Sequence, residues 1–266
     1  MLQNFMLSEE KQSMAETGHA KNVANFGVLV SYVEGYGATY TPSNTSITLT
    51  ALEAKLGLAE DSLEGVLTAL APWKNAVNAR ETSYEGLQKL VTRVVNSFAA
   101  SGADQNAVND AKSIKRKIDG ARAKALPKDD PETPENESQG HSVSQRSYSQ
   151  TAEFFDELIA FLSTNSGFYN PNEAALKLTA LTTRSGEMKA ANSEVNGTAV
   201  PLSNARIARD VQLYTLTSGL VDLAGLVKKY VKSVYGADSL QFKQISGLVF
   251  RKVKKLTAEL PPVSDD

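Results

Sequence analysis

The sequence contains an internal duplication, which limits the chain to folds that can be built twice from one unit. A shift of 129 residues aligns Leu49–Leu52 with Leu178–Leu181. Landmarks on either side align at the same shift: Tyr40 with Tyr169, Pro42 with Pro171, Pro72 with Pro201, Asn75 with Asn204, and Arg80 with Arg209. Towards the end of each copy the shift becomes 134, which places five extra residues in the second copy. We therefore expect two copies of one structural unit.

Apolar residues recur in both copies at the spacing of amphipathic α-helices. The first predicted helix of each copy follows an i, i+3, i+4, i+7 pattern: Phe26, Leu29, Val30 and Val33, and then Phe155, Leu158, Ile159 and Leu162. Residues 49–70 alternate three- and four-residue steps, which is typical of a helical-bundle seam. Pro72 and Pro201 stand where a third helix would begin, because a proline in the first helical turn loses no hydrogen bond. A shorter fourth helix completes each copy.

This pattern predicts an all-α protein made of two tandem, homologous up-and-down four-helix bundles. The first bundle is expected over residues 20–120 and the second over residues 148–257. Residues 121–147 contain three prolines among acidic side chains and have no apolar period, so we expect an acidic, proline-containing linker there. Residues 1–19 and 258–266 are expected to be tails.

Three segments of the second copy carry a resemblance to a known family. They are Pro201–Arg209, Val227–Ala237 and Gln241–Gly247. They are similar to segments of a group of duplicated, all-helical bacterial proteins of unknown function, and the likeness covers most of the chain. The resemblance implies the helical, duplicated fold. It implies no activity, because that group has no assigned chemistry.

The residue types needed for several kinds of catalysis are missing. The chain has no cysteine, which excludes disulfides, thiolate metal sites and a cysteine nucleophile. Its two histidines, His19 and His141, fall in the predicted tail and linker, so neither a di-metal Glu-x-x-His site nor a serine triad can be assembled in a bundle. Gly35-Tyr36-Gly37 lacks the third glycine of a dinucleotide-binding loop. We expect a non-enzymatic protein without cofactor or metal.

Hydropathy gives no sign of a membrane span. The most apolar windows, Phe26–Val33 and Gly219–Val227, are too short to cross a bilayer. Residues 1–14 lack the basic and apolar regions of a signal peptide, which predicts a cytoplasmic location. A peripheral membrane or pore-forming helical protein is a weaker alternative, because neither a long apolar hairpin nor an exposed amphipathic helix is evident.

Basic residues gather late in each copy. The candidate basic face of the second copy comprises Lys228, Lys229, Lys232, Arg251, Lys252, Lys254 and Lys255. Its counterpart in the first copy comprises Lys112, Lys115, Arg116 and Lys117. Such faces would bind phosphates by charge neutralisation, so sequence-nonspecific nucleic-acid binding is the alternative function. An ordinary solvated surface near helix C-termini accounts for the same residues.

The loops between the first and second predicted helices are candidate interaction sites. They combine aromatic residues with prolines: Tyr36, Tyr40 and Pro42 in the first copy, and Phe168, Tyr169 and Pro171 in the second. Tyrosine with glycine and asparagine is typical of contact surfaces, and loops on a rigid scaffold commonly carry function. The structural alternative is that each tyrosine closes the open end of its bundle.

Arg80 and Arg209 fall on the apolar seam of the third predicted helix in each copy. A buried guanidinium needs a carboxylate or carbonyl partner. If the chain turns back at the prolines, Asp61 or Glu64 comes near Arg80, and Glu187 comes near Arg209. Each arginine would then form either a register-fixing ion pair or part of a polar ligand pocket.

The sequence as a whole predicts a helical scaffold or interaction protein. The net charge of −2 gives no general attraction to nucleic acid or anionic membrane, so a protein partner is favoured. Two similar surfaces on one chain would give avidity for a repeated partner.

Overall fold

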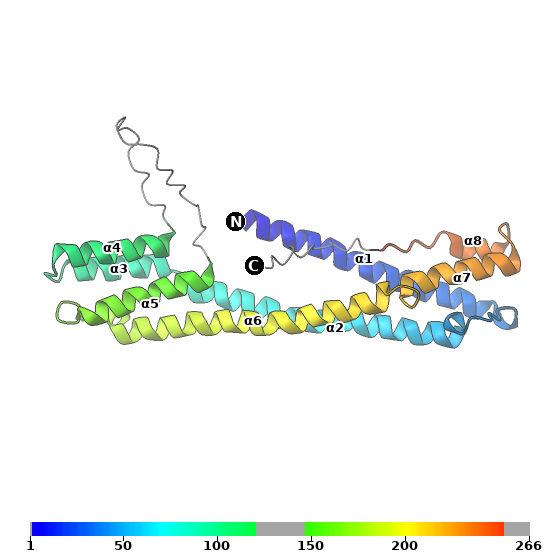
Figure 1. The fold of residues 1–266 in the computed structure, drawn as a ribbon, viewed down its shortest axis with the longest axis horizontal. Helices are drawn as coiled ribbons and strands as arrows, with labels where there is room; N and C mark the ends of the chain where they lie inside the picture. Colours follow the sequence, from blue (N-terminus) through cyan, green and yellow to red (C-terminus); the bar gives the residue numbers. More distant parts are fainter. Residues whose placement is uncertain (1, 121–146, 253–266) are drawn as a thin grey trace, which may run out of the picture. The chain divides into compact units, whose positions relative to one another are not determined.

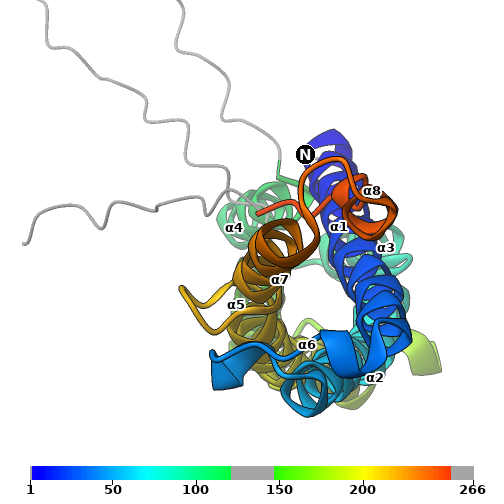
Figure 2. The same cartoon turned by 90° about the vertical axis from the view of Figure 1, so that its right-hand side faces the viewer.

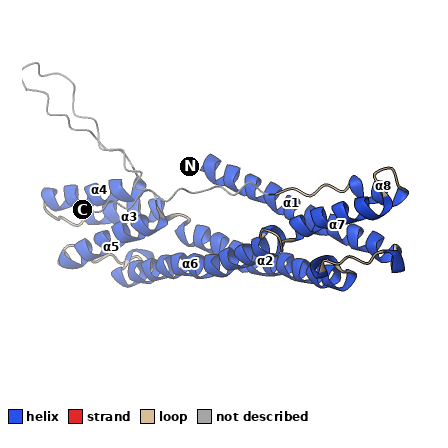
Figure 3. Cartoon of the chain, turned by 45° about the vertical axis from the view of Figure 1, so that its right-hand side comes forward, coloured by secondary structure: helices blue, strands red, loops and turns tan. Residues whose placement is uncertain are grey.

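The computed structural model describes residues 2–120 and 147–252, and all regular secondary structure in them is helical (Figure 1 and Figure 3). This confirms the all-α prediction. The α-helices are α1 (Leu2–Gly35), α2 (Leu49–Tyr84), α3 (Leu87–Ala99), α4 (Gln105–Asp119), α5 (Tyr148–Thr164), α6 (Leu178–Tyr214), α7 (Leu220–Tyr235) and α8 (Leu240–Ser246). Short 3₁₀ turns are η1 (Gly37–Thr39), η2 (Thr45–Ile47) and η3 (Ala174–Leu176).

Both prolines expected to begin a helix lie inside one. Pro72 is within α2 and Pro201 is within α6, so the second and third predicted helices of each copy are one continuous helix. The prediction of a turn at these prolines is wrong. An interior proline removes one backbone hydrogen bond, yet both helices continue through it. Helix α1 also begins at Leu2, where residues 1–19 were expected to be a tail.

Two compact units make up the chain. Unit 1 consists of Met1–Ala71 and Val200–Asp266, and unit 2 consists of Pro72–Ala199. Each unit takes the first part of one sequence copy and the last part of the other, because α2 and α6 each contribute residues to both units. This division differs from the predicted bundles at 20–120 and 148–257. The predicted linker and C-terminal tail lie outside the described residues, apart from Ser147.

The core of unit 1 forms between α1, the first part of α2, the last turns of α6, and α7. Its fully buried side chains include Phe26, Leu29, Leu52, Leu220 and Val227. Helices α7 and α8 pack beside α1 (Figure 2). The apolar stripe predicted for residues 26–33 therefore does face a core, but the helix it meets comes from the second copy.

The core of unit 2 is built from α3, α4, α5 and the first part of α6. Its fully buried side chains include Phe98, Phe155, Leu158, Leu162 and Leu181. Helix α4 begins at an Asp104 N-cap that accepts a hydrogen bond from the Asn106 amide at 2.9 Å. Ser147 caps α5 in the same way. These caps fix the starts of α4 and α5.

Candidate functional site

The two loop tyrosines are structural residues. The Tyr40 hydroxyl donates a hydrogen bond to the Ile47 carbonyl at 2.7 Å, and the Tyr169 hydroxyl donates to the Leu176 carbonyl at 2.6 Å. Both rings are buried. Burial raises the pKa of Tyr169 to about 12 and raises the pKa of Tyr40 further. The same contact at aligned positions means that both loops fold back on themselves in one way.

The other predicted loop residues divide between packing and exposure. Tyr36 is half-buried, and its hydroxyl donates to the Gln241 carbonyl at 2.9 Å. Pro42 and Pro171 are half-buried as well. Phe168 remains an exposed aromatic, with half of its surface accessible. The predicted aromatic residues of these loops, apart from Phe168, therefore contribute to packing more than to an exposed contact surface.

The predicted basic face is partly used inside unit 1. The Lys228 amine donates to the Ser246 carbonyl at 3.1 Å and also to the Leu248 carbonyl, and burial lowers the pKa of Lys228. Lys252 forms an ion pair with Asp222 at 2.6 Å. The exposed members of the set are Lys229, Lys232, Arg251 and the paired Lys252, while Lys254 and Lys255 lie outside the described residues.

The first-copy basic residues also have carboxylate partners. Lys115 pairs with Asp119 on α4, and Lys117 pairs with Glu157 on α5 at 2.9 Å. Lys112 and Arg116 are exposed. Since several of these cations already contact carboxylates or carbonyls, fewer are free to neutralise phosphates than the sequence predicted.

Residues Gly247–Lys252, called here the C-terminal segment, are held by their backbone. Asn22 of α1 donates to the Arg251 carbonyl at 2.8 Å and accepts from the Arg251 amide at 3.0 Å. Asn25 donates to the Val249 carbonyl at 2.8 Å. Lys228 of α7 holds the carbonyls of Ser246 and Leu248. Alternate carbonyls therefore face α1 and α7, as expected for an extended chain between two helices.

Sequence reasoning did not identify this arrangement. Asn22 is buried and Asn25 lies near it on α1, but in the sequence both look like ordinary polar positions beside the apolar stripe. His19, expected in a tail, is also buried, and its Nδ1 lies 2.6 Å from the Tyr214 hydroxyl. The buried polar residues His19 and Asn22 lie three positions apart on α1. Their spacing can be read from the sequence, but their burial is seen only in the structure.

The two seam arginines have different surroundings. Arg209 is buried, and its Nε and Nη2 donate to Asp210 Oδ1 at 3.0 and 2.8 Å. The guanidinium carbon of Arg80 lies 4.1 Å from the centre of the Tyr148 ring, a cation–π contact. Arg80 Nε is buried and has no hydrogen-bond partner among the described residues.

The predicted carboxylate partners of these arginines are wrong. Glu187 contacts Arg184 at 3.7 Å and lies 22 positions before Arg209 on the same helix. At 1.5 Å per residue this separation is roughly 33 Å. Asp61 and Glu64 lie on α2 with Arg80, again well down one continuous helix. The error results directly from the turn that was expected at the prolines.

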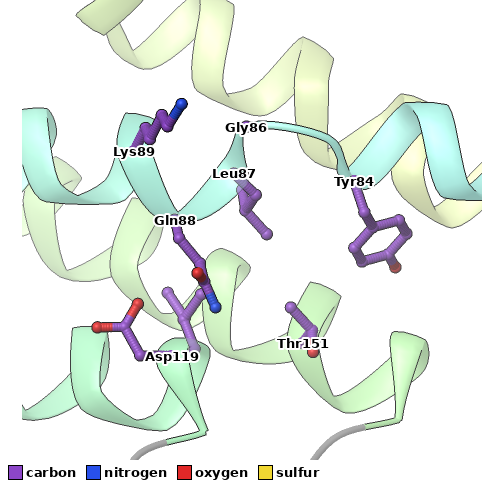
Figure 4. A pocket seen from close by; sticks show the side chains of 8 residues that line it. Tyr84, Gly86, Leu87, Gln88, Lys89, Asp119 and Thr151 are labelled. Carbon is purple, nitrogen blue, oxygen red and sulfur yellow. The ribbon is translucent and has the colours of Figure 1, made fainter. Parts of the chain in front are cut away.

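A cavity of about 450 Å³ opens in unit 2 where α2 ends and α3 begins (Figure 4). Its walls come from α2, α3, α4 and α5, and it is lined by Tyr84, Gly86, Leu87, Gln88, Lys89, Ile118, Asp119 and Thr151. Figure 4 shows the Gln88 side chain reaching toward Asp119 across from Thr151, with Lys89 at the rim and pointing outward. The cavity thus combines an apolar wall with polar groups from four helices.

The polar groups of this cavity are only partly satisfied. The Tyr84 hydroxyl donates to the Tyr148 carbonyl at 2.7 Å and accepts from Asn192 at 2.7 Å, and burial raises the pKa of Tyr84. One oxygen of Asp119 bonds to Lys115, while Oδ1 is buried without a hydrogen-bond partner in the described part of the chain. A buried acceptor without a donor is a costly arrangement that a bound ligand would relieve.

A second cavity, of about 300 Å³, lies in unit 1 beside the C-terminal segment. It is lined by Gly18, Lys21, Asn25, Gly247, Leu248, Val249 and Arg251. Because Asn25 and the segment backbone already bond to each other, the space is a remainder beside an occupied groove.

Within residues 2–120 and 147–252, no group of three or more His, Cys, Asp or Glu side chains is placed to hold a metal ion. The helices of that part of the chain include none long and apolar enough to cross a membrane. Comparisons with protein families, curated proteins and solved structures find no match to this chain. The resemblance to duplicated helical bacterial proteins therefore stays a prediction, and the function has to be inferred from the geometry of the chain itself.

Proposed function

We propose that this chain is a non-enzymatic helical scaffold that binds a protein partner. The observation that carries the proposal is that the side chains of Asn22, Asn25 and Lys228 donate hydrogen bonds to backbone carbonyls of the chain at the C-terminal segment. A groove that bonds alternate carbonyls accepts an extended polypeptide with little dependence on its side chains. Unit 1 thus already binds one polypeptide, its own C-terminal segment, through backbone hydrogen bonds.

The repeated architecture supports the same proposal. The matching Tyr40 and Tyr169 contacts fit two homologous units derived from one duplication. A partner with repeated segments could bind both units of one chain, and the two attachments together would give avidity. A cytoplasmic location remains part of the proposal.

The test is an affinity pull-down of the full chain from native lysate, read by mass spectrometry and repeated after nuclease treatment. We expect specific protein capture that survives nuclease and persists at moderate salt. Capture that disappears with nuclease, together with DNA or RNA binding that weakens steeply as salt rises, would instead establish the nucleic-acid alternative. Liposome flotation of the same protein tests the membrane alternative.

A further inference from the structure

The cavity of unit 2 is lined in part by residues that correspond to those that hold the C-terminal segment in unit 1. In both units a tyrosine near the end of a long helix accepts a hydrogen bond from an asparagine amide, Tyr214 from Asn22 and Tyr84 from Asn192. Each tyrosine ring also contacts one of two residues that the duplication aligns, His19 in unit 1 and Tyr148 in unit 2. The asparagine donors come from helices that the duplication does not align, α1 and α6, so the comparison of the two units rests on the aligned His19 and Tyr148 and on two further positions.

Two further positions correspond between the units. Thr151 aligns with Asn22 at the shift of 129 residues. Lys89 and Asp222 are each the third residue of the helix that follows a glycine N-cap, α3 in unit 2 and α7 in unit 1. Thr151 and Lys89 both line the cavity.

In unit 1 the corresponding residues, Asn22 and Asp222, bind the C-terminal segment. Asn22 bonds both backbone groups of Arg251, and Asp222 pairs with the next side chain, Lys252. In unit 2 the corresponding Thr151 and Lys89 line a cavity, and the last residues of α4, Ile118 and Asp119, form another of its sides.

Groups suited to a peptide line this cavity and its rim. Asp119 Oδ1 is a buried acceptor with no hydrogen-bond donor among the residues that the structure describes. A ligand backbone N–H would supply one, as the Arg251 N–H does for Asn22 Oδ1. The Gln88 amide makes no side-chain hydrogen bond, and Lys89 makes no ion pair, with any described residue. Lys89 of unit 2 stands at the position of Asp222 in unit 1, which pairs with a lysine of the segment. A ligand at Lys89 is therefore expected to carry a negative charge instead of a positive one.

We propose that this cavity is a binding site for an extended peptide of a partner protein, with a carboxylate side chain that pairs with Lys89. The inference rests on the proposed scaffold function and names the chemistry of its partner. A second copy of this chain is a poor occupant, because its Lys252 would meet Lys89, a like charge. The carboxylate side chain therefore selects a different protein.

Two labelled hexapeptides test the site on the full chain by fluorescence anisotropy. One has the composition of the C-terminal segment, acetyl-Gly-Leu-Val-Phe-Arg-Lys-amide, and the other ends in Glu in place of Lys. We expect the Glu peptide to bind about two- to fivefold more tightly, the range of an exposed ion pair. Lys89→Glu should reverse this preference, while Lys112→Glu on exposed α4 surface serves as the matched control.

Several results would overturn the site. These are equal binding of the two peptides, no binding of either, or a preference that Lys89→Glu leaves unchanged. Lys-peptide binding that Asn22→Ala abolishes would also contradict it, because the peptide would then be replacing the C-terminal segment in unit 1. A partner protein captured equally by the wild type and Lys89→Glu would leave the scaffold function standing and remove this site.

Discussion

The two units use one helical plan and differ in what covers one groove. In unit 1, α8 is seven residues long and the C-terminal segment continues along the groove in an extended form. In unit 2, α4 is fifteen residues long and leaves a cavity of about 450 Å³ beyond its last turn. In the first unit Asn22 and Asp222 bond the C-terminal segment, whereas in the second Asp119 Oδ1 has no hydrogen-bond partner among the described residues. A candidate site thus arises where the two repeats diverge, on a scaffold that they share.

The largest expected difference concerns the two glycine N-caps. A Cβ on Gly219 would lie 2.6 Å from the Thr215 carbonyl oxygen and 2.7 Å from its nitrogen, both backbone atoms that cannot move aside. Gly219→Ala should therefore destabilise the chain by about 3 kcal/mol. Gly86 has open space around it but a left-handed φ of 73°, so Gly86→Ala should cost about 1 kcal/mol. Urea unfolding of both variants checks the order, and equal losses would contradict it.

A smaller, equal effect is expected from the loop tyrosines. Tyr40→Phe and Tyr169→Phe each leave a carbonyl without its donor and should each cost about 1–2 kcal/mol. Thermal unfolding of the two single variants measures this. Should one substitution be neutral and the other costly, the loops would not be equivalent.

The same tyrosines predict a loss of stability at alkaline pH. Their pKa values are raised in the folded chain, to about 12 for Tyr169, so folding favours the protonated hydroxyl. Their contribution is complete below the unfolded pKa of about 10 and is lost as pH rises through the folded pKa. Stability of the Tyr169→Phe variant should fall less steeply than wild type between pH 10 and 12. Parallel pH profiles would exclude this source of alkaline sensitivity.

The smallest effect belongs to the ion pair that fastens the C-terminal segment. The hydrogen bond from Lys252, followed by that from the Thr217 amide, lowers the pKa of Asp222. This contribution is present above the unfolded pKa of about 4 and is lost as pH falls through the lowered folded pKa. Asp222→Asn should cost less than about 1 kcal/mol at pH 7 and nothing once Asp222 is protonated. Asp110→Asn, at an exposed position of unit 2, should change stability at neither pH.

Periodicity was sufficient to predict the helices but not their partners. The stripe Phe26 to Val33 correctly identified a buried helix face, since burial of that face needs only local spacing. The partner helix depends on whether the chain turns at Pro72, and a proline fits both a helix start and a tolerated interior position. The choice of a turn then led to the wrong partners for Arg80 and Arg209.

The candidate cavity could not be predicted from the sequence, for a related reason. Its walls combine Tyr84, Lys89, Asp119 and Thr151 from four helices of both copies, and none of these residues belongs to a recognisable motif. Only the exchange of halves between the copies brings α4 and α5 together. The tyrosine loops, in contrast, are local, and their bundle-closing role was one of the two interpretations that the sequence allowed.

Cysteine cross-linking tests most directly the claim that each unit combines halves of both copies. The chain has no native cysteine, so engineered pairs react without background. Lys55 and Gln212 contact each other at 2.9 Å in unit 1, and Lys117 and Glu157 at 2.9 Å in unit 2, and each pair joins the two sequence copies. With a short bismaleimide, the double variants Lys55→Cys/Gln212→Cys and Lys117→Cys/Glu157→Cys should each give a cross-linked monomer in a yield independent of protein concentration. Absence of the monomeric cross-link in both variants, with both cysteines still reactive, would contradict the exchange.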